Sequence, residues 1–165
     1  MNLILIGKGA VLFNIAKLII KKEKYKLLKV LWDNKKNNES DKYYLKNLRK
    51  SINVIQVNNI NSRKNIFFLK KQNFNYLLSI NNTQIFNDLF LNQFKNKVIN
   101  YHYSLIPSYK GLFSCTKVIL RNEKFSGISW HYVSKKIDDG KLIFQKKFKI
   151  NKNDNAAILI SKLNN

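Results

Sequence analysis

The amino-acid sequence predicts an α/β fold with a mostly parallel sheet, helices on both of its faces and an antiparallel strand or hairpin near the C-terminal end. Short, wholly apolar runs such as residues 3–6 alternate with segments whose apolar residues repeat at helical spacing. This alternation is typical of strands joined by right-handed helical crossovers. Towards the C-terminus, two apolar runs are instead separated by the acidic turn Asp138-Asp139-Gly140, an Asp-Gly step typical of a hairpin or tight loop.

The first predicted unit is a strand over residues 3–6, the turn Gly7-Lys8-Gly9 and a helix whose apolar positions run from Val11 to Ile19. A strand that is apolar on both faces suits the interior of a parallel sheet. This order of elements is Rossmann-like. The sequence continues with predicted strands at 27–32, 54–57, 75–80 and 97–101, a polar loop at 33–40, and helices around 43–48 and 66–69.

The last third of the chain has a different pattern. A helix is predicted over residues 112–121, two strands over 127–133 and 141–150, and a final helix over 156–163. We find no internal repeat and no linker. The 165 residues suit one domain and are enough to bury a full core.

The net charge of +22 comes from 31 Lys and Arg against 9 Asp and Glu. One interpretation is a surface that binds nucleic acid. The other is genome composition, because lysines far outnumber arginines, are scattered along the chain, and occur with abundant Asn and Ile and little Gly and Pro. Readers of nucleic-acid sequence favour arginine, whose planar fork pairs with phosphates and guanine edges. Binding of a polyanionic partner therefore stays as an alternative to genome composition.

Several classes of protein are disfavoured. No apolar run approaches the roughly 20 residues of a membrane helix, and the N-terminus shows no basic leader or cleavage site. We therefore expect a cytoplasmic protein with no membrane partner. The single cysteine, Cys115, excludes an internal disulfide, and two histidines placed far apart do not make a metal site.

The turn Gly7-Lys8-Gly9 raises the alternative of a nicotinamide or flavin site. A full dinucleotide fingerprint needs a third glycine, and Leu12 stands in its place, although Asp33 at the end of the second predicted strand fits that interpretation. The turn could still offer backbone N–H groups to an anion at the start of a helix.

The segment with the most chemistry follows the fifth predicted strand. Asn100 and His102 occupy alternate positions and therefore share one face. In an open α/β sheet, ligands bind beyond the carboxyl ends of the strands, where these two residues lie. The only proline, Pro107, then predicts a rigid turn.

Three ordered motifs carry a resemblance to a known family. They are Asn100-Tyr101-His102 with Ser104-Leu105-Ile106-Pro107 and Tyr109-Lys110-Gly111; Gly127-Ile128-Ser129-Trp130-His131; and Asp138-Asp139-Gly140-Lys141-Leu142-Ile143-Phe144-Gln145. This pattern resembles the formyltransferase family, including glycinamide ribonucleotide and methionyl-tRNA formyltransferases. The resemblance runs from the first strand to Ile150 and is closest to sugar N-formyltransferases and the formylation domains of peptide synthetases.

The resemblance implies one catalytic domain over residues 1–165, of the N-terminal type and without the usual C-terminal elements. It also implies transfer of a formyl group from 10-formyltetrahydrofolate to a primary amine on a small molecule, an amino sugar or a carrier-bound aminoacyl group. The alternatives are formylation of methionyl-tRNA, hydrolysis of formyltetrahydrofolate, and a non-catalytic folate- or nucleic-acid-binding remnant. An apolar face left by the short C-terminus could be covered by a partner or in a homodimer.

The family pattern assigns roles to individual residues, each of which also has an ordinary structural explanation when taken singly. Asn100 would donate a hydrogen bond to the oxyanion, His102 would exchange a proton, and Asp138 would hold the imidazolium or order a water molecule. His131 could line the site or serve only in packing. Residues of the folate pocket would be Gln84, Ile85, Phe86, Ser134, Lys135, Lys136 and Ile137. Residues near the acceptor would be Gly7, Lys8, Gly9, Ala10, Ser104, Tyr109, Gly111 and His131.

Overall fold

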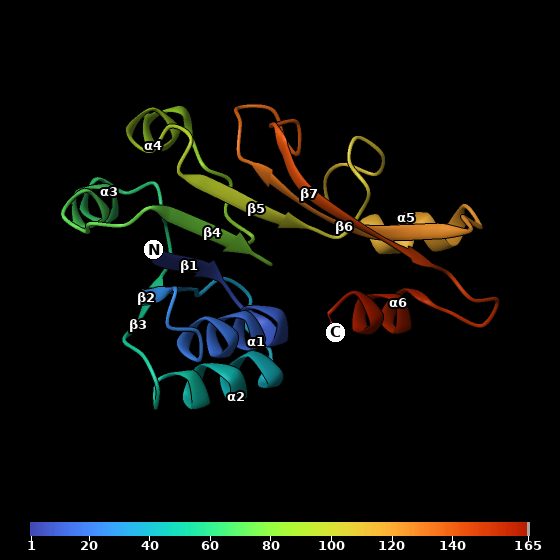
Figure 1. Ribbon diagram of the computed structural model, residues 1–165, viewed down its shortest axis with the longest axis horizontal. Coiled ribbons are helices and arrows are strands. Elements are labelled where there is room, and N and C mark those ends of the chain that lie inside the picture. Colours follow the sequence, from blue (N-terminus) through green and yellow to red (C-terminus); the bar gives the residue numbers. More distant parts are fainter. Residues whose placement is uncertain (165) are drawn as a thin grey trace. The chain divides into compact units, whose positions relative to one another are not determined.

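The computed structural model describes residues 1–164 and divides into two compact units, Met1–Ile99 and the part that begins at Asn100. The described residues form seven strands and six helices (Figure 1). Strands that alternate with helices in the first unit and an antiparallel pair in the second confirm the predicted α/β class.

The strands of the first unit pair in parallel, in the order β3-β2-β1-β4. They are β1 (Asn2–Gly7), β2 (Lys26–Asp33), β3 (Val54–Val57) and β4 (Tyr76–Ile80). The side chains of residues 3–6 on β1 are all buried, as expected of a strand with neighbours on both sides. Gly7 closes β1 with a φ of 136°, and a Cβ there would stand 1.7 Å from the carbonyl oxygen of Ile80. Only glycine therefore fits this point of contact between β1 and β4.

The helices of the first unit cover both faces of its strands. Figure 1 shows α1 and α2 together on one side of the strands, and α3 and α4 together on the other. Their bounds are α1 (Gly9–Ile20), α2 (Glu39–Leu48), α3 (Arg63–Lys70) and α4 (Asp88–Gln93). The start of α2 is fixed by a capping box, in which Asn38 accepts from the Asp41 amide and Asp41 accepts from the Asn38 amide.

The second unit is built on β5 (Val98–His102), whose last three residues belong to it, and on an antiparallel pair. Its other elements are α5 (Ser114–Leu120), β6 (Phe125–Tyr132), β7 (Leu142–Lys149) and α6 (Ala156–Leu163). Helices α5 and α6 pack around Cys115, Val118, Leu159 and Leu163. The Tyr101 hydroxyl donates to the Leu163 carbonyl oxygen over 2.8 Å and so ties β5 to α6.

The structure differs from the sequence prediction at a few points. Helix α4 was not predicted, α2 begins at Glu39 inside the expected polar loop, and the connection between β6 and β7 extends over residues 133–141 rather than a tight turn. Leu142, Ile143 and Phe144 on β7 are exposed. In the part of the chain that the structure describes, the helices are too short or too polar to span a bilayer.

Candidate active site

The end of β5 and the loop between β6 and β7 bring three polar side chains together. The Asn100 amide nitrogen Nδ2 lies 3.4 Å from Oδ1 of Asp138. The other carboxylate oxygen of Asp138, Oδ2, lies 3.4 Å from Nδ1 of His102. Asn100 and His102 reach the same carboxylate because they occupy alternate positions of one strand. An amide, an imidazole and a carboxylate thus share one small volume of the second unit.

Asp138 is the centre of this cluster. Its backbone has a φ of 48°, which is uncommon for a residue with a side chain, and Oδ2 accepts the Gly111 amide over 2.8 Å. Burial alone would raise the pKa of Asp138. The contact with the His131 side chain and the hydrogen bond from the Gly111 amide, together with the charges of the two imidazoles, outweigh burial, so the net pKa lies below its ordinary value. The carboxyl group is therefore ionised at neutral pH.

The His102 ring has an acceptor facing each of its nitrogens. Nε2 lies 3.0 Å from the Tyr109 carbonyl oxygen, and Nδ1 faces the Asp138 carboxylate. A carbonyl oxygen only accepts, so Nε2 carries hydrogen. The neutral ring then presents the Nδ1 lone pair to a carboxylate, whereas the imidazolium donates at both positions. The ring is thus held between a carbonyl oxygen and a carboxylate.

His131 also belongs to the cluster. Its Nδ1 lies 2.9 Å from the Tyr132 carbonyl oxygen and therefore carries hydrogen, which leaves Nε2 to accept from Asn100 Nδ2 over 3.2 Å. Nε2 is also 3.4 Å from Oδ1 of Asp138. The side chain is almost fully buried. His131 thus fixes the orientation of the Asn100 amide and contacts the carboxylate, beyond any part in packing.

The turn after β5 is held by side chains from the other motifs. The Ser104 hydroxyl donates to the Ser108 carbonyl oxygen over 2.8 Å. Gln145 donates from Nε2 to the Ile106 carbonyl oxygen over 2.7 Å, and the Ser129 hydroxyl accepts the Ile106 amide over 3.2 Å. This gives a physical reason for the motif residues on β6 and β7, because they fix the turn that carries Tyr109 and Gly111.

The residues 84–86, expected at the folate pocket, belong to the first unit. The Gln84 side chain is buried and bonded within the protein, to the Ile60 amide, the Val57 carbonyl oxygen and Oδ1 of Asp33. Ile85 is exposed, and the Phe86 ring lies against Phe90, with centroids 4.9 Å apart. The backbone and the Ile85 side chain are therefore what this segment can offer to a ligand.

Asp33 shows why a dinucleotide site is disfavoured. Its carboxylate is fully buried and accepts from the Thr83 amide and hydroxyl, the Gln84 side chain and the Lys35 amide. Burial raises the pKa of Asp33, but these hydrogen bonds outweigh it and leave the pKa below its ordinary value. A carboxylate so fully bonded inside the protein is poorly placed to bind a ribose hydroxyl.

The expected acceptor residues 7–10 also lie in the first unit, at the start of α1. The Lys8 side chain is buried, and its ammonium group donates to the carbonyl oxygens of Lys35 and Lys36, the latter over 2.9 Å. It lies 3.9 Å from an Asp41 carboxylate oxygen. Lys8 thus joins the turn after β1 to the loop that follows β2. Gly9, with a φ of 81°, begins helix α1.

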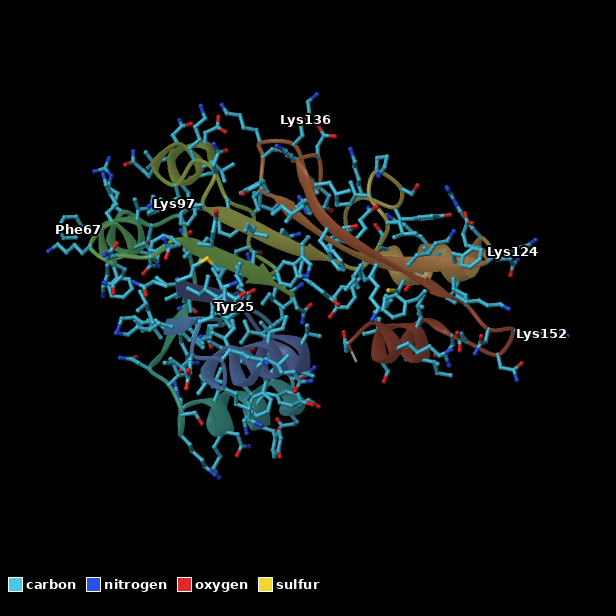
Figure 2. The ribbon with its side chains drawn as sticks, viewed as in Figure 1. Tyr25, Phe67, Lys97, Lys124, Lys136 and Lys152 are labelled. Carbon is cyan, nitrogen blue, oxygen red and sulfur yellow. The ribbon has the colours of Figure 1, made fainter. Side chains whose placement is uncertain are left out.

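Residues 134–137 lead directly into Asp138. The Ser134 hydroxyl donates to the Lys136 carbonyl oxygen over 2.9 Å, and Ile137 is exposed. Figure 2 shows the Lys136 side chain directed away from the strands at the end of this loop. Within residues 1–164, no cluster of three or more His, Cys, Asp or Glu side chains is arranged to hold a metal ion.

Sequence comparisons agree on one family. The family model described as formyl transferase matches residues 10–165. The bifunctional polymyxin resistance protein ArnA of Wigglesworthia glossinidia brevipalpis is 33% identical over 118 residues, which cover 72% of this chain and 18% of that protein. A methionyl-tRNA formyltransferase of Clostridium tetani is 32% identical over 117 residues, or 70% of this chain and 38% of that protein. The chain thus matches less than two fifths of the length of either relative.

Solved structures share the fold over almost the whole chain. The phosphoribosylglycinamide formyltransferase of Bacillus halodurans superposes with a TM-score of 0.80 at 20% identity, over 99% of this chain and 87% of that one. An N-formyltransferase of Helicobacter canadensis, solved in complex with folinic acid and dTDP-3-aminofucose, superposes with a TM-score of 0.75 at 26% identity, over 98% of this chain and 58% of that one.

Proposed function

The chain belongs to the formyl transferase family, and from this premise we propose that it transfers a formyl group from 10-formyltetrahydrofolate to a primary amine. Asn100, His102 and Asp138 are the proposed catalytic residues. The observation that carries the proposal is the Asp138 carboxylate, which faces the amide of Asn100 on one side and the imidazole of His102 on the other.

The reaction needs groups that stabilise charge and move one proton. The amine attacks the formyl carbon and forms a tetrahedral intermediate with a negative oxygen and a positive nitrogen. When the intermediate collapses, the bond from carbon to N10 of the folate breaks, N10 gains a proton and the amine nitrogen loses one. The products are a formamide and tetrahydrofolate, so no oxidant or metal is needed for the balance.

Asn100 is the proposed donor to the oxyanion. Its Nδ2 carries two hydrogens, and in the structure these face His131 at 3.2 Å and Asp138 at 3.4 Å. The contact to Asp138 is the longer one, so its hydrogen is the one that an oxyanion would attract. Loss of a single donor of this kind typically costs about 2.7–4 kcal/mol of barrier height.

His102 and Asp138 are the proposed proton-handling pair. Asp138 is ionised at neutral pH because its pKa lies below the ordinary value, burial being outweighed by hydrogen bonds and by the imidazole charges. The carboxylate can stabilise an imidazolium at His102 or order a water molecule that carries the proton from the amine. The Tyr109 carbonyl oxygen, 3.0 Å from Nε2, keeps the other side of the ring in place.

We assign the two substrates to different groups of residues. The folate would contact residues 84–86 and Ser134, Lys135, Lys136 and Ile137, and the acceptor would contact residues 7–10, Ser104, Tyr109, Gly111 and His131. Support for a formylated folate comes from the Helicobacter canadensis N-formyltransferase, which was solved with folinic acid. The same structure, with its amino-sugar nucleotide, supports an amino sugar among the proposed acceptors, which also include another small amine and a carrier-bound aminoacyl group.

A second candidate acceptor is methionyl-tRNA. It is favoured by the net charge of +22 and by the methionyl-tRNA formyltransferases among the relatives. Lys124, Lys136 and Lys152 are exposed on the second unit, and Figure 2 shows each directed outward. A polyanion held by such lysines would dissociate steeply as salt concentration rises, whereas a small amine would not.

The test is incubation of the protein with 10-formyltetrahydrofolate and a panel of acceptors, followed by mass spectrometry. The panel holds amino-sugar nucleotides, aminoacyl carriers, free amino acids and methionyl-tRNA. The proposal expects one acceptor to gain one formyl group with release of tetrahydrofolate. Formate release without any acceptor would show hydrolysis instead. Binding of the folate with neither product would show a non-catalytic remnant and overturn the proposal.

A further inference from the structure

We propose that Lys110 is a positioning residue, whose ion pair with Asp139 holds residues 109–111 against the loop between β6 and β7 and so sets the His102–Asp138 pair. This inference rests on the proposed function, because it concerns the efficiency of the same site. Lys110 belongs to neither group of residues assigned above to the folate or to the acceptor.

Three consecutive residues of one loop contact the site. The Tyr109 carbonyl oxygen lies 3.0 Å from Nε2 of His102, and the Gly111 amide donates to Oδ2 of Asp138 over 2.8 Å. Between them, the Lys110 ammonium group donates to Oδ1 of Asp139, the neighbour of Asp138. Adjacent residues of the first loop, Lys110 and Gly111, therefore bind the adjacent residues Asp139 and Asp138 of the second. The neighbouring Tyr109 carbonyl oxygen orients the His102 imidazole.

Both segments depend on such contacts because neither is regular secondary structure. Tyr109 and Asp138 adopt left-handed backbone conformations with φ of 56° and 48°, and Gly111 has a φ of 79°. Such conformations are costly for residues with a side chain and persist where neighbouring contacts fix them. The Lys110–Asp139 ion pair is a direct side-chain link between the two loops.

The exposure of the pair indicates that its role is geometric. The side chains of Lys110 and Asp139 remain 34% and 43% exposed, and ion pairs this open to solvent add little to folding stability. The pKa of Asp139 lies below its ordinary value, chiefly because of the hydrogen bond from Lys110, so its carboxyl group is ionised at neutral pH. Loss of the pair should therefore disturb the site more than the fold.

The chain offers a matched control. Lys162 pairs with Asp154 in the same unit at 2.6 Å, and its side chain is also 34% exposed. The experiment compares Lys110→Gln, Asp139→Asn and the conservative Lys110→Arg with Lys162→Gln. For each full-length variant it measures kcat, the KM of both substrates, the melting temperature, and the hydrogen-exchange rate of the Gly111 amide by NMR.

We expect kcat to fall about tenfold or more in Lys110→Gln and in Asp139→Asn, as in other cases where reacting groups are slightly misplaced. Both KM values should change less than about twofold, the Gly111 amide should exchange faster, and Lys110→Arg should restore both properties. Lys162→Gln should leave kcat and the Gly111 exchange rate unchanged.

Unchanged kcat and unchanged Gly111 exchange in Lys110→Gln would overturn the inference. So would a rise in the KM of the acceptor alone, which would mark Lys110 as a binding residue. If Lys110→Gln does not fold, Asp139→Asn decides by the same criteria. A wild-type protein without formyl transfer would refute the proposed function, while the Gly111 exchange rate would still report whether the ion pair holds the two loops together.

Discussion

Oδ2 of Asp138 lies 3.4 Å from Nδ1 of His102, although the two residues come from different parts of the chain. One stands at the end of β5 and the other in the loop between β6 and β7. The Tyr109 carbonyl oxygen holds the far side of the ring and the Gly111 amide holds the carboxylate. The relationship between these two side chains is therefore imposed by the backbone on both sides.

Replacement of the carboxylate tests its charge. Asp138→Asn keeps the size of the side chain and an oxygen for the Gly111 amide, but it removes the negative charge that faces both imidazoles. We predict a fall in kcat of about 100-fold or more, in the range typical of acid–base catalysis. Initial rates of formyl transfer, measured with saturating substrates, check this.

The control for that variant is Asp154→Asn, which removes a carboxylate of the same unit that accepts the Asn151 amide and pairs with Lys162. It should lower the melting temperature without lowering kcat of the folded protein. If Asp138→Asn retained the wild-type rate, Asp138 would have no catalytic role.

Removal of the proposed oxyanion donor tests Asn100. In Asn100→Ala, kcat should fall about 10²- to 10³-fold because the transition state loses one hydrogen bond. The variant also leaves Nε2 of His131 without its donor, so the melting temperature should be recorded beside the rate.

Asn155→Ala provides the comparison for Asn100→Ala. Asn155 caps α6 by accepting the Ile158 amide over 2.9 Å, and its loss should destabilise the protein by about 1 kcal/mol while kcat stays the same. Equal effects of the two asparagine variants on kcat would contradict a role for Asn100 in the transition state.

The glycine after Asp139 tests the loop that carries Asp138. A Cβ at Gly140 would stand 1.7 Å from the Tyr132 carbonyl oxygen, so Gly140→Ala must displace the loop. We predict destabilisation of about 1–3 kcal/mol, the usual range for overpacking, together with a loss of activity.

Gly111→Ala is the matched substitution for Gly140→Ala, because a Cβ at Gly111 meets nothing within 4 Å and only its positive φ is strained. That variant should cost about 1 kcal/mol of stability. Chemical denaturation of both variants makes the comparison. A Gly140→Ala protein as stable and active as the wild type would show that the loop is free to move.

Acid should destabilise the protein through buried carboxylates such as Asp33. Its pKa in the folded state lies below the ordinary value of 3.8, because four hydrogen bonds outweigh burial. A group of this kind contributes stability above its unfolded pKa and loses it as pH falls through the lower, folded pKa. The free energy of unfolding should therefore fall as pH drops below 3.8.

The variant Asp33→Asn should be less stable at neutral pH by roughly 1.5–3 kcal/mol, since hydrogen bonds to a charged group are lost, and should lose less stability in acid. Denaturation curves at neutral pH and below 3.8 measure both effects. Glu23→Gln, at an exposed position, should change neither. An identical acid response of Asp33→Asn and the wild type would mean that these hydrogen bonds do not lower the pKa of Asp33.

Most of the fold could be predicted from the sequence because the strands of the first unit are short apolar runs between clear breaks. Strand β3 and helix α6 have the bounds predicted for them. Helix α4 was missed because it has six residues, too few to show helical periodicity. The start of α2 has a sequence signal, since Asn38 followed by Asp41 fits a capping box, but the polar composition of residues 33–40 favours a loop.

The residue types at the candidate site could be predicted from motifs, but their contacts could not. Periodicity places Asn100 and His102 on one face of a strand, yet it gives no sign that His131 would orient the Asn100 amide. The contacts of Tyr109 and Gly111 are made by backbone atoms, which leave no trace in residue identity. The pairing of Lys110 with Asp139 likewise depends on the path of two loops.

The most direct test of the account is the rate at which the formylated amine forms from saturating 10-formyltetrahydrofolate, compared between the wild type and His102→Ala. We predict product and an equal amount of tetrahydrofolate from the wild type, and a rate at least about 100-fold lower from the folded variant. Equal rates from the two proteins would contradict the account.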